Sequence, residues 1–131
     1  AGGGAPEALL AAFLKDWSGR FDGRQQLAIK KYAEALEIIP LTIAENAGMD
    51  PIDTMVALRA KQSDGKKWTG INAKEGKISD MLAQNIVEPV VVKQQIIKSA
   101  TETASMILRI DDVIAISGAP GGGGGGMPPM G

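Results

Sequence analysis

Two polar side chains in one short stretch have the chemistry to hold a ligand. The stretch runs from Gly70 to Pro89 and reads GINAKEGKISDMLAQNIVEP. The amide of Asn72 offers donors and acceptors to a ligand edge, and the carboxylate of Glu88 accepts hydrogen bonds from hydroxyl groups. The residue types alone leave a second interpretation open, in which Asn72 is a turn residue and Glu88 caps a helix.

A run of glycines near the start of the chain is the other candidate for ligand contact. Residues 1–5 read AGGGA. Such a run is typical of a flexible linker. It also suits a place where the backbone must approach a ligand without a Cβ atom in the way. The sequence pattern by itself does not decide between these two roles.

The composition excludes several classes of function. The chain has 131 residues, a net charge of −1, no cysteine and no histidine. It therefore lacks thiol chemistry, the commonest metal ligand and the usual general base. A near-neutral charge gives no basic field for nucleic acid or an anionic membrane. No apolar run reaches membrane-spanning length and no signal peptide opens the chain, so we expect a cytoplasmic protein.

Hydrophobic periodicity predicts a mainly helical domain over residues 1–117. Helices are expected over 6–17, 22–47, 50–61 and from Pro89 to about Arg109. The second of these contains Pro40, which should kink it because the periodicity resumes in register. On that helix Leu41 falls on the polar stripe between Glu37 and Glu45, so we expect its side chain to be exposed.

Two segments are predicted to be extended, and one to lack structure. The stretch that begins at Gly70 favours a β-hairpin, with Ala73–Gly76 in its turn. Residues 110–117 are typical of a short C-terminal strand, which would need an edge from another chain or segment. Residues 118–131 read GAPGGGGGGMPPMG and are expected to form a flexible tail, because glycine has no side chain to bury.

Taken together, these motifs resemble the C-terminal portion of a chaperonin, most closely the archaeal thermosome type of the group II chaperonins. The similarity extends over nearly the whole chain. The matching words are GGGAPE at 2–7, GRQQLAI at 23–29, ALEIIP at 35–40, TIAENAGMDPID at 42–53, VEPVVVK at 87–93, IKSATETASMILRIDDVI at 97–114, and the glycine- and methionine-rich tail.

The resemblance implies the second half of a helical, ATP-binding equatorial domain. In such a domain Gly2, Gly3 and Gly4 form the loop bordering the nucleotide, with Gly3 as the closest contact. The spacing from Gly70 to Pro89 also resembles the group I bacterial pattern. That pattern implies that Asn72 and Ala73 lie against adenine and that Glu88 binds the ribose hydroxyls. All are binding residues, and no catalytic or metal-binding residue is expected in this chain.

The resemblance also implies what other parts of a subunit would supply. Family members are several times longer, and the phosphate-binding Gly-Asp-Gly-Thr motif, the catalytic aspartate and the apical domain do not occur here. ATP or ADP would be the ligand, with magnesium held by those other parts, and this chain alone should be inactive. Expected partners are other subunits in a double ring and unfolded proteins.

The chain departs from the family at two positions, and two other functions are also considered. Members usually have arginine where this chain has Leu41 and Val91, so the subunit or domain contacts of those charges are not expected. One rival function is a helical assembly module that has lost nucleotide binding. The other, a free-standing small enzyme, has little support because the chain lacks histidine, cysteine and a phosphate loop.

Overall fold

The computed structural model describes the backbone of residues 1–117 and the side chains of residues 1–110. The described chain divides into a first unit, Ala1–Glu88, and a second that begins at Pro89. The elements of the first unit are α1 (Ala5–Trp17), the 3₁₀ helix η1 (Ser18–Arg20), α2 (Gly23–Asn46), α3 (Pro51–Ser63), β1 (Thr69–Asn72) and β2 (Lys77–Asp80). The predicted tail, residues 118–131, lies outside the described residues.

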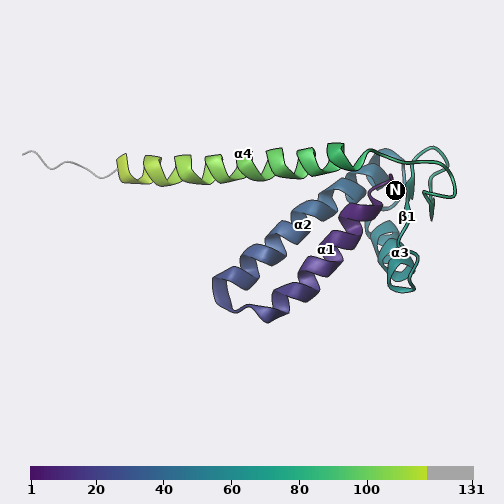
Figure 1. Ribbon diagram of the computed structural model, residues 1–131, viewed down its shortest axis with the longest axis horizontal. Helices are drawn as coiled ribbons and strands as arrows, with labels where there is room; N and C mark the ends of the chain where they lie inside the picture. The colour runs from purple at the N-terminus through teal and green to yellow at the C-terminus, as the bar shows by residue number, and fades with distance from the viewer. Residues whose placement is uncertain (118–131) are drawn as a thin grey trace, which may run out of the picture. The chain divides into compact units, whose positions relative to one another are not determined.

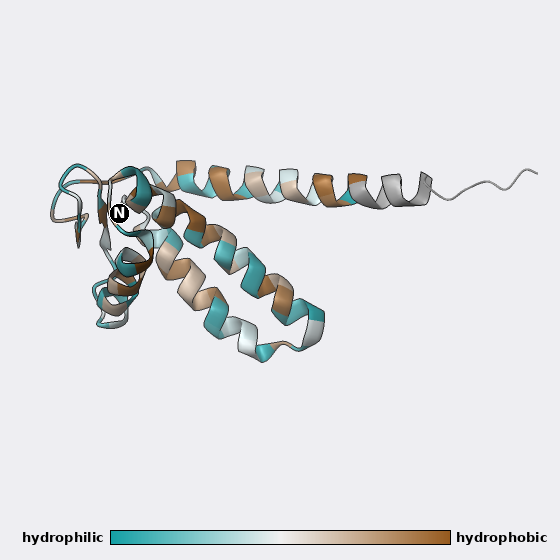
Figure 2. Cartoon of the chain, turned by 180° about the vertical axis from the view of Figure 1, so that it is seen from behind, coloured by the Kyte–Doolittle hydropathy of each residue, from teal (hydrophilic) through white to brown (hydrophobic). Residues whose placement is uncertain are grey.

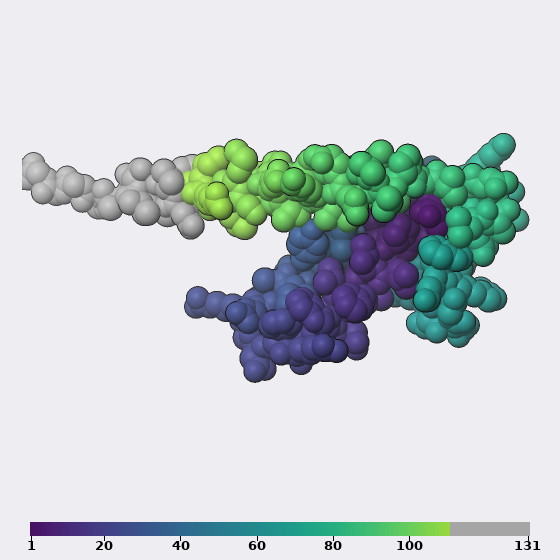
Figure 3. Space-filling view, in the orientation of Figure 1, coloured from purple at the N-terminus to yellow at the C-terminus, as the bar shows by residue number. Residues whose placement is uncertain are grey.

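The helices of the first unit begin and end where the sequence predicts. Pro6 lies in the first turn of α1, and α2 continues through Pro40. The side chain of Asp50 accepts a hydrogen bond from the Asp53 amide at 2.8 Å and so caps α3. Helices α1 and α2 pack side by side and are joined through η1 (Figures 1 and 3). The mainly helical fold is therefore confirmed.

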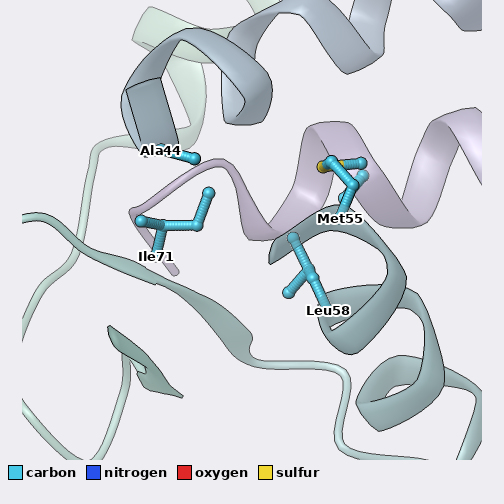
Figure 4. Close-up of a cluster of buried hydrophobic side chains, with 5 residues drawn as sticks. Ala44, Met55, Leu58 and Ile71 are labelled. Atoms are coloured by element: carbon cyan, nitrogen blue, oxygen red, sulfur yellow. The ribbon is translucent and has the colours of Figure 1, made fainter. Parts of the chain in front are cut away.

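The core lies where α1, α2, α3 and the hairpin meet. Its buried side chains are Ala8, Ala44, Met55, Leu58 and Ile71 (Figure 4). Strands β1 and β2 pair antiparallel, with Ile71 opposite Ile78 and Asn72 opposite Lys77. Ile71 places β1 in this core, which fixes the position of Asn72 at the end of the strand.

The N-terminal glycine segment, Gly2–Gly4, crosses β1 at backbone-to-backbone distance. The Ile71 amide donates to the Gly3 carbonyl at 2.8 Å. A Cβ atom on Gly3 would lie 2.5 Å from the Ile71 oxygen, and one on Gly70 would lie 2.7 Å from the Gly2 oxygen. Gly3 also has a φ of 65°, which side chains other than glycine rarely adopt. The crossing therefore requires glycine on both segments.

The predicted exposure of Leu41 on α2 is wrong, and Glu37 on the same polar stripe is also covered. Leu41 is partly buried and packs against the core cluster. Glu37 is only 6% exposed, and its carboxylate pairs with Lys15 at 2.7 Å and Arg59 at 2.5 Å. Both side chains are covered for the same reason: α1 and α3 pack against a face of α2 that its own periodicity marks as polar.

The second unit contains α4 (Val90–Ser117), and it corrects the predicted C-terminal strand. Residues 110–117 continue the helix. A single strand leaves its backbone groups without partners, whereas a helix satisfies them within the segment, and the apolar spacing of Ile110, Val113 and Ile114 also fits a helix. Hydrophobic residues recur along α4 (Figure 2), and many are exposed, including Val91 and Leu108.

Replacing Leu41 with arginine should destabilise the first unit. Because Leu41 packs against the core, we expect Leu41→Arg to lower the free energy of unfolding by about 1–2 kcal/mol. Ile38→Arg is the matched control, since Ile38 lies on the same helix and is 59% exposed. A denaturant melt of both variants checks this, and equal stability of the two would contradict the burial of Leu41.

The crossing of the glycine segment and β1 predicts a steric cost at Gly70. A Cβ atom there would also lie 2.8 Å from Met81 Cγ, so the surrounding backbone must shift. We expect Gly70→Ala to lower the free energy of unfolding by about 1–3 kcal/mol. Gly19→Ala is the control, because a Cβ atom at Gly19 meets nothing within 4 Å. If Gly70→Ala and Gly19→Ala have the same free energy of unfolding, the crossing is loose enough to accept a Cβ atom.

Candidate functional site

The structure brings Gly2 and Glu88 together from opposite ends of the first unit. The Gly2 amide donates to the Ile86 carbonyl at 2.9 Å. A Cβ atom on Gly2 would lie 3.0 Å from Ile86 Cγ2 and 3.4 Å from Glu88 Oε1. The Glu88 side chain is exposed. The glycine segment therefore borders a carboxylate that solvent can reach.

The other two glycines of this segment contact protein. Gly3 lies against Ile71, as described above. Gly4 has a φ of 71° and is the N-cap of α1. A Cβ atom on Gly4 would lie 2.8 Å from Pro40 Cβ. Packing of the protein on itself therefore explains glycine at both positions, whether or not a ligand is near.

Asn72 is a turn residue in this structure. Its side chain is buried, and Oδ1 accepts hydrogen bonds from the amides of Lys74 at 3.1 Å and Glu75 at 3.2 Å. Its Nδ2 donates to Gln84 Oε1. A carboxamide has two donor hydrogens and two acceptor positions, so these bonds leave Asn72 one N–H for a ligand. Ala73 follows in the hairpin turn and is exposed.

A cavity of about 530 Å³ opens beside Asn72. Its remaining lining comes from the hairpin turn and the loop after β2: Lys74, Glu75, Ala83, Gln84, Asn85 and Ile86. The Ile86 carbonyl accepts the hydrogen bond from the Gly2 amide. The cavity therefore adjoins the place where Gly2 meets Glu88. Three of the predicted residues thus lie near one region, with Asn72 on the cavity wall and Gly2 and Glu88 beside Ile86.

Sequence reasoning missed Gln84 and Asn85. Gln84 holds the Asn72 amide, and it also hydrogen-bonds Glu75. The hydrogen bond from Lys77, at 2.9 Å, and then its charge are the main causes that lower the pKa of the Glu75 carboxyl, and the Gln84 bond adds to them. Asn85 adopts a φ of 56°, which asparagine tolerates better than most residues. The adjacent amides in the loop were the available signal.

The backbone places Glu88 one residue before the N-cap of α4. Helix α4 begins at Val90, and the Pro89 carbonyl accepts the amides of Val92 at 3.1 Å and Lys93 at 3.4 Å. The residue whose carbonyl accepts the first helical bond is the N-cap, so that position belongs to Pro89. Glu88 precedes the cap.

The described residues lack two features that other functions would need. Within residues 1–110, whose side chains the structure describes, no group of three or more carboxylate, histidine or cysteine side chains is placed to hold a metal ion. No described helix has the length and apolar character needed to cross a membrane. The arrangement offers hydrogen bonds to the polar edge of a ligand, and it contains no metal centre within the described part.

Comparison with known proteins identifies relatives along the whole described chain. The model of the TCP-1/cpn60 chaperonin family matches residues 1–117. A thermosome subunit of Methanopyrus kandleri is 56% identical over 115 residues, which cover 88% of this chain and 21% of the relative. The thermosome subunit beta of Archaeoglobus fulgidus is 51% identical over 133 residues, covering 98% of this chain and 24% of the relative.

A solved structure agrees with the fold. It is the open-state monomer of a group II chaperonin from Methanococcoides burtonii, with a TM-score of 0.81 and 46% identity over 83% of this chain and 27% of that one. The chain spans 21% and 24% of the lengths of the two thermosome relatives. It belongs to the TCP-1/cpn60 chaperonin family, and its sequence and mainly helical fold are those of an equatorial-domain segment of the thermosome type.

Proposed function

We propose that this chain forms the adenosine side of the ATP site of a cytoplasmic, protein-folding chaperonin. The observation that carries the proposal is the meeting of Gly2 and Glu88 beside a cavity lined by Asn72. These are residues that the family resemblance assigns to nucleotide. Hydrolysis of ATP in the complete assembly would drive its folding cycle on unfolded proteins.

Each of these residues contacts the part of the nucleotide that suits its chemistry. The Glu88 carboxylate accepts hydrogen bonds from the two adjacent ribose hydroxyls. The remaining N–H of Asn72 donates to the edge of adenine, and exposed Ala73 packs against the base. Gly2–Gly4 border the nucleotide through their backbone, with Gly2 rather than Gly3 beside Glu88.

Phosphate and magnesium recognition belong to other parts of a subunit. The sequence contains no phosphate loop, and the described residues contain no group that fits a metal ion. Magnesium, when bound there, neutralises the charge that develops on the phosphates. Exposed apolar side chains on the first unit, such as Phe13, Ile52 and Val56, would be covered by those other parts and by neighbouring subunits of a double ring.

One observation favours a second function, a helical assembly module that has lost nucleotide binding. Hydrogen bonds within the protein already occupy three of the four positions on the Asn72 amide. An amide held in this way can serve the hairpin alone. Titration of a complete ring with nucleotide separates the two functions, because only the first requires binding.

The chain on its own should neither bind ATP tightly nor hydrolyse it. It carries the proposed adenosine contacts but lacks those to phosphate and magnesium, where most charge recognition lies. We expect calorimetric titration to give a dissociation constant weaker than about 1 μM, which corresponds to roughly −8 kcal/mol. Tighter binding, or turnover above buffer, would show that this chain holds the phosphates itself.

Glu88 is the most direct test of the adenosine site. The assay uses a hybrid ring, in which this chain replaces the matching segment of the Methanopyrus kandleri thermosome subunit. A hydrogen bond to a charged group contributes about 1.5–3 kcal/mol, so we expect Glu88→Ala to weaken ATP binding roughly ten- to a hundredfold. Glu88→Asp should retain much of the affinity, because the charge remains.

A denaturant melt of the same variants provides the control. Glu88 is exposed and lies outside the helix cap, so its replacement should change the free energy of unfolding by less than about 0.5 kcal/mol. Unchanged ATP affinity combined with lower stability would give Glu88 a structural role and favour the assembly module.

A further inference from the structure

A buried glutamine joins the two segments that cross beside the candidate site. Gln62 on α3 is 7% exposed, and its Nε2 donates to the carbonyl of Ala5 at 2.9 Å and to that of Thr69 at 3.1 Å. Ala5 directly follows the glycine segment, and Thr69 directly precedes Gly70 on β1. One carboxamide therefore clamps both sides of the crossing.

This clamp requires a side chain that can donate two hydrogen bonds, and the Gln62 amide does so without burying a charge. Both partners are carbonyl oxygens, which only accept hydrogen bonds, so the site calls for two donors on one atom. The Gln62 oxygen, Oε1, is also buried and has no hydrogen-bond partner among the described side chains and backbone. Burying such an oxygen is unfavourable, and a methionine of similar length would avoid that cost. The two donated bonds are the compensation for it.

The clamp sets the spacing of the candidate ligand groups. The glycine segment carries Gly2, which lies beside Glu88, and β1 ends in Asn72 on the cavity wall. Apart from the Gln62 bonds, the described glycine segment and β1 share one backbone hydrogen bond, from the Ile71 amide to the Gly3 carbonyl. A shift of one relative to the other would move the ribose side of the site away from the adenine side.

We propose that Gln62 is a positioning residue for nucleotide binding, which holds the glycine segment against β1 without touching the nucleotide. The proposal rests on the proposed function. It predicts that loss of the two hydrogen bonds weakens ATP recognition more than an equally destabilising change elsewhere. Small misplacements of binding groups lower affinity even where every contact residue is retained.

The test compares Gln62→Met with Ser18→Ala in the hybrid ring described above. Ser18→Ala also removes a buried hydrogen bond, from Ser18 Oγ to the Lys15 carbonyl at 2.6 Å, but at the far end of α1. We expect Gln62→Met to raise the KM for ATP about fivefold or more with kcat within about twofold. Ser18→Ala should lower the melting temperature and leave the KM unchanged.

Two further variants make every outcome decisive. If Gln62→Met does not assemble, Gln62→Asn is measured, because its shorter amide reaches at most one of the two carbonyls and should also raise the KM. An unchanged KM in the assembled Gln62 variant overturns the proposal. If Glu88→Ala raises the KM in the same ring while the Gln62 variant does not, only the positioning role is lost. If neither raises it, the adenosine site itself is wrong.

Discussion

The close crossing of the glycine segment over β1 is the constraint on which the rest of the first unit depends. Two backbones approach each other there without side chains between them, at Gly3 and Gly70. This contact determines where α1 starts, and α1 then packs along α2. It also places β1 against α3, through Ile71 in the core and through Gln62 beside it. A glycine run whose composition is typical of a flexible linker is thus closely packed against β1.

The helices were predictable from sequence because their signals are local. Asp50 with Pro51 and the hairpin turn each act within a few residues, and the structure agrees with both. Exposure on α2 was not predictable in the same way. Glu37 is buried because Lys15 and Arg59, on two other helices, reach it and compensate its charge. No periodicity within α2 contains that information, and the same holds for Leu41.

In the candidate site too, some features were predictable from the sequence and others depend on contacts with distant residues. Residue types and family resemblance gathered Gly2, Asn72, Ala73 and Glu88, and the structure places them around one region, yet no sequence signal showed that the Asn72 amide is held by Gln84 and by its own turn. The predicted strand at residues 110–117 failed for a physical reason. A strand without an edge partner cannot satisfy its backbone, so the segment continues α4.

Large apolar side chains are exposed on both units of the chain. Isolated apolar residues on a surface are ordinary, but here large ones recur over both units, among them Phe13, Ile52, Trp68 and Val91. At Val91 an arginine would have suited solvent better, yet valine is 70% exposed.

A site formed by the meeting of chain segments needs those segments held in place, and in the first unit buried polar contacts do this. Glu37 ties α2 to α1 and α3, and Gln62 ties α3 to α1 and β1. The geometry around the cavity therefore depends on contacts that lie within the first unit itself.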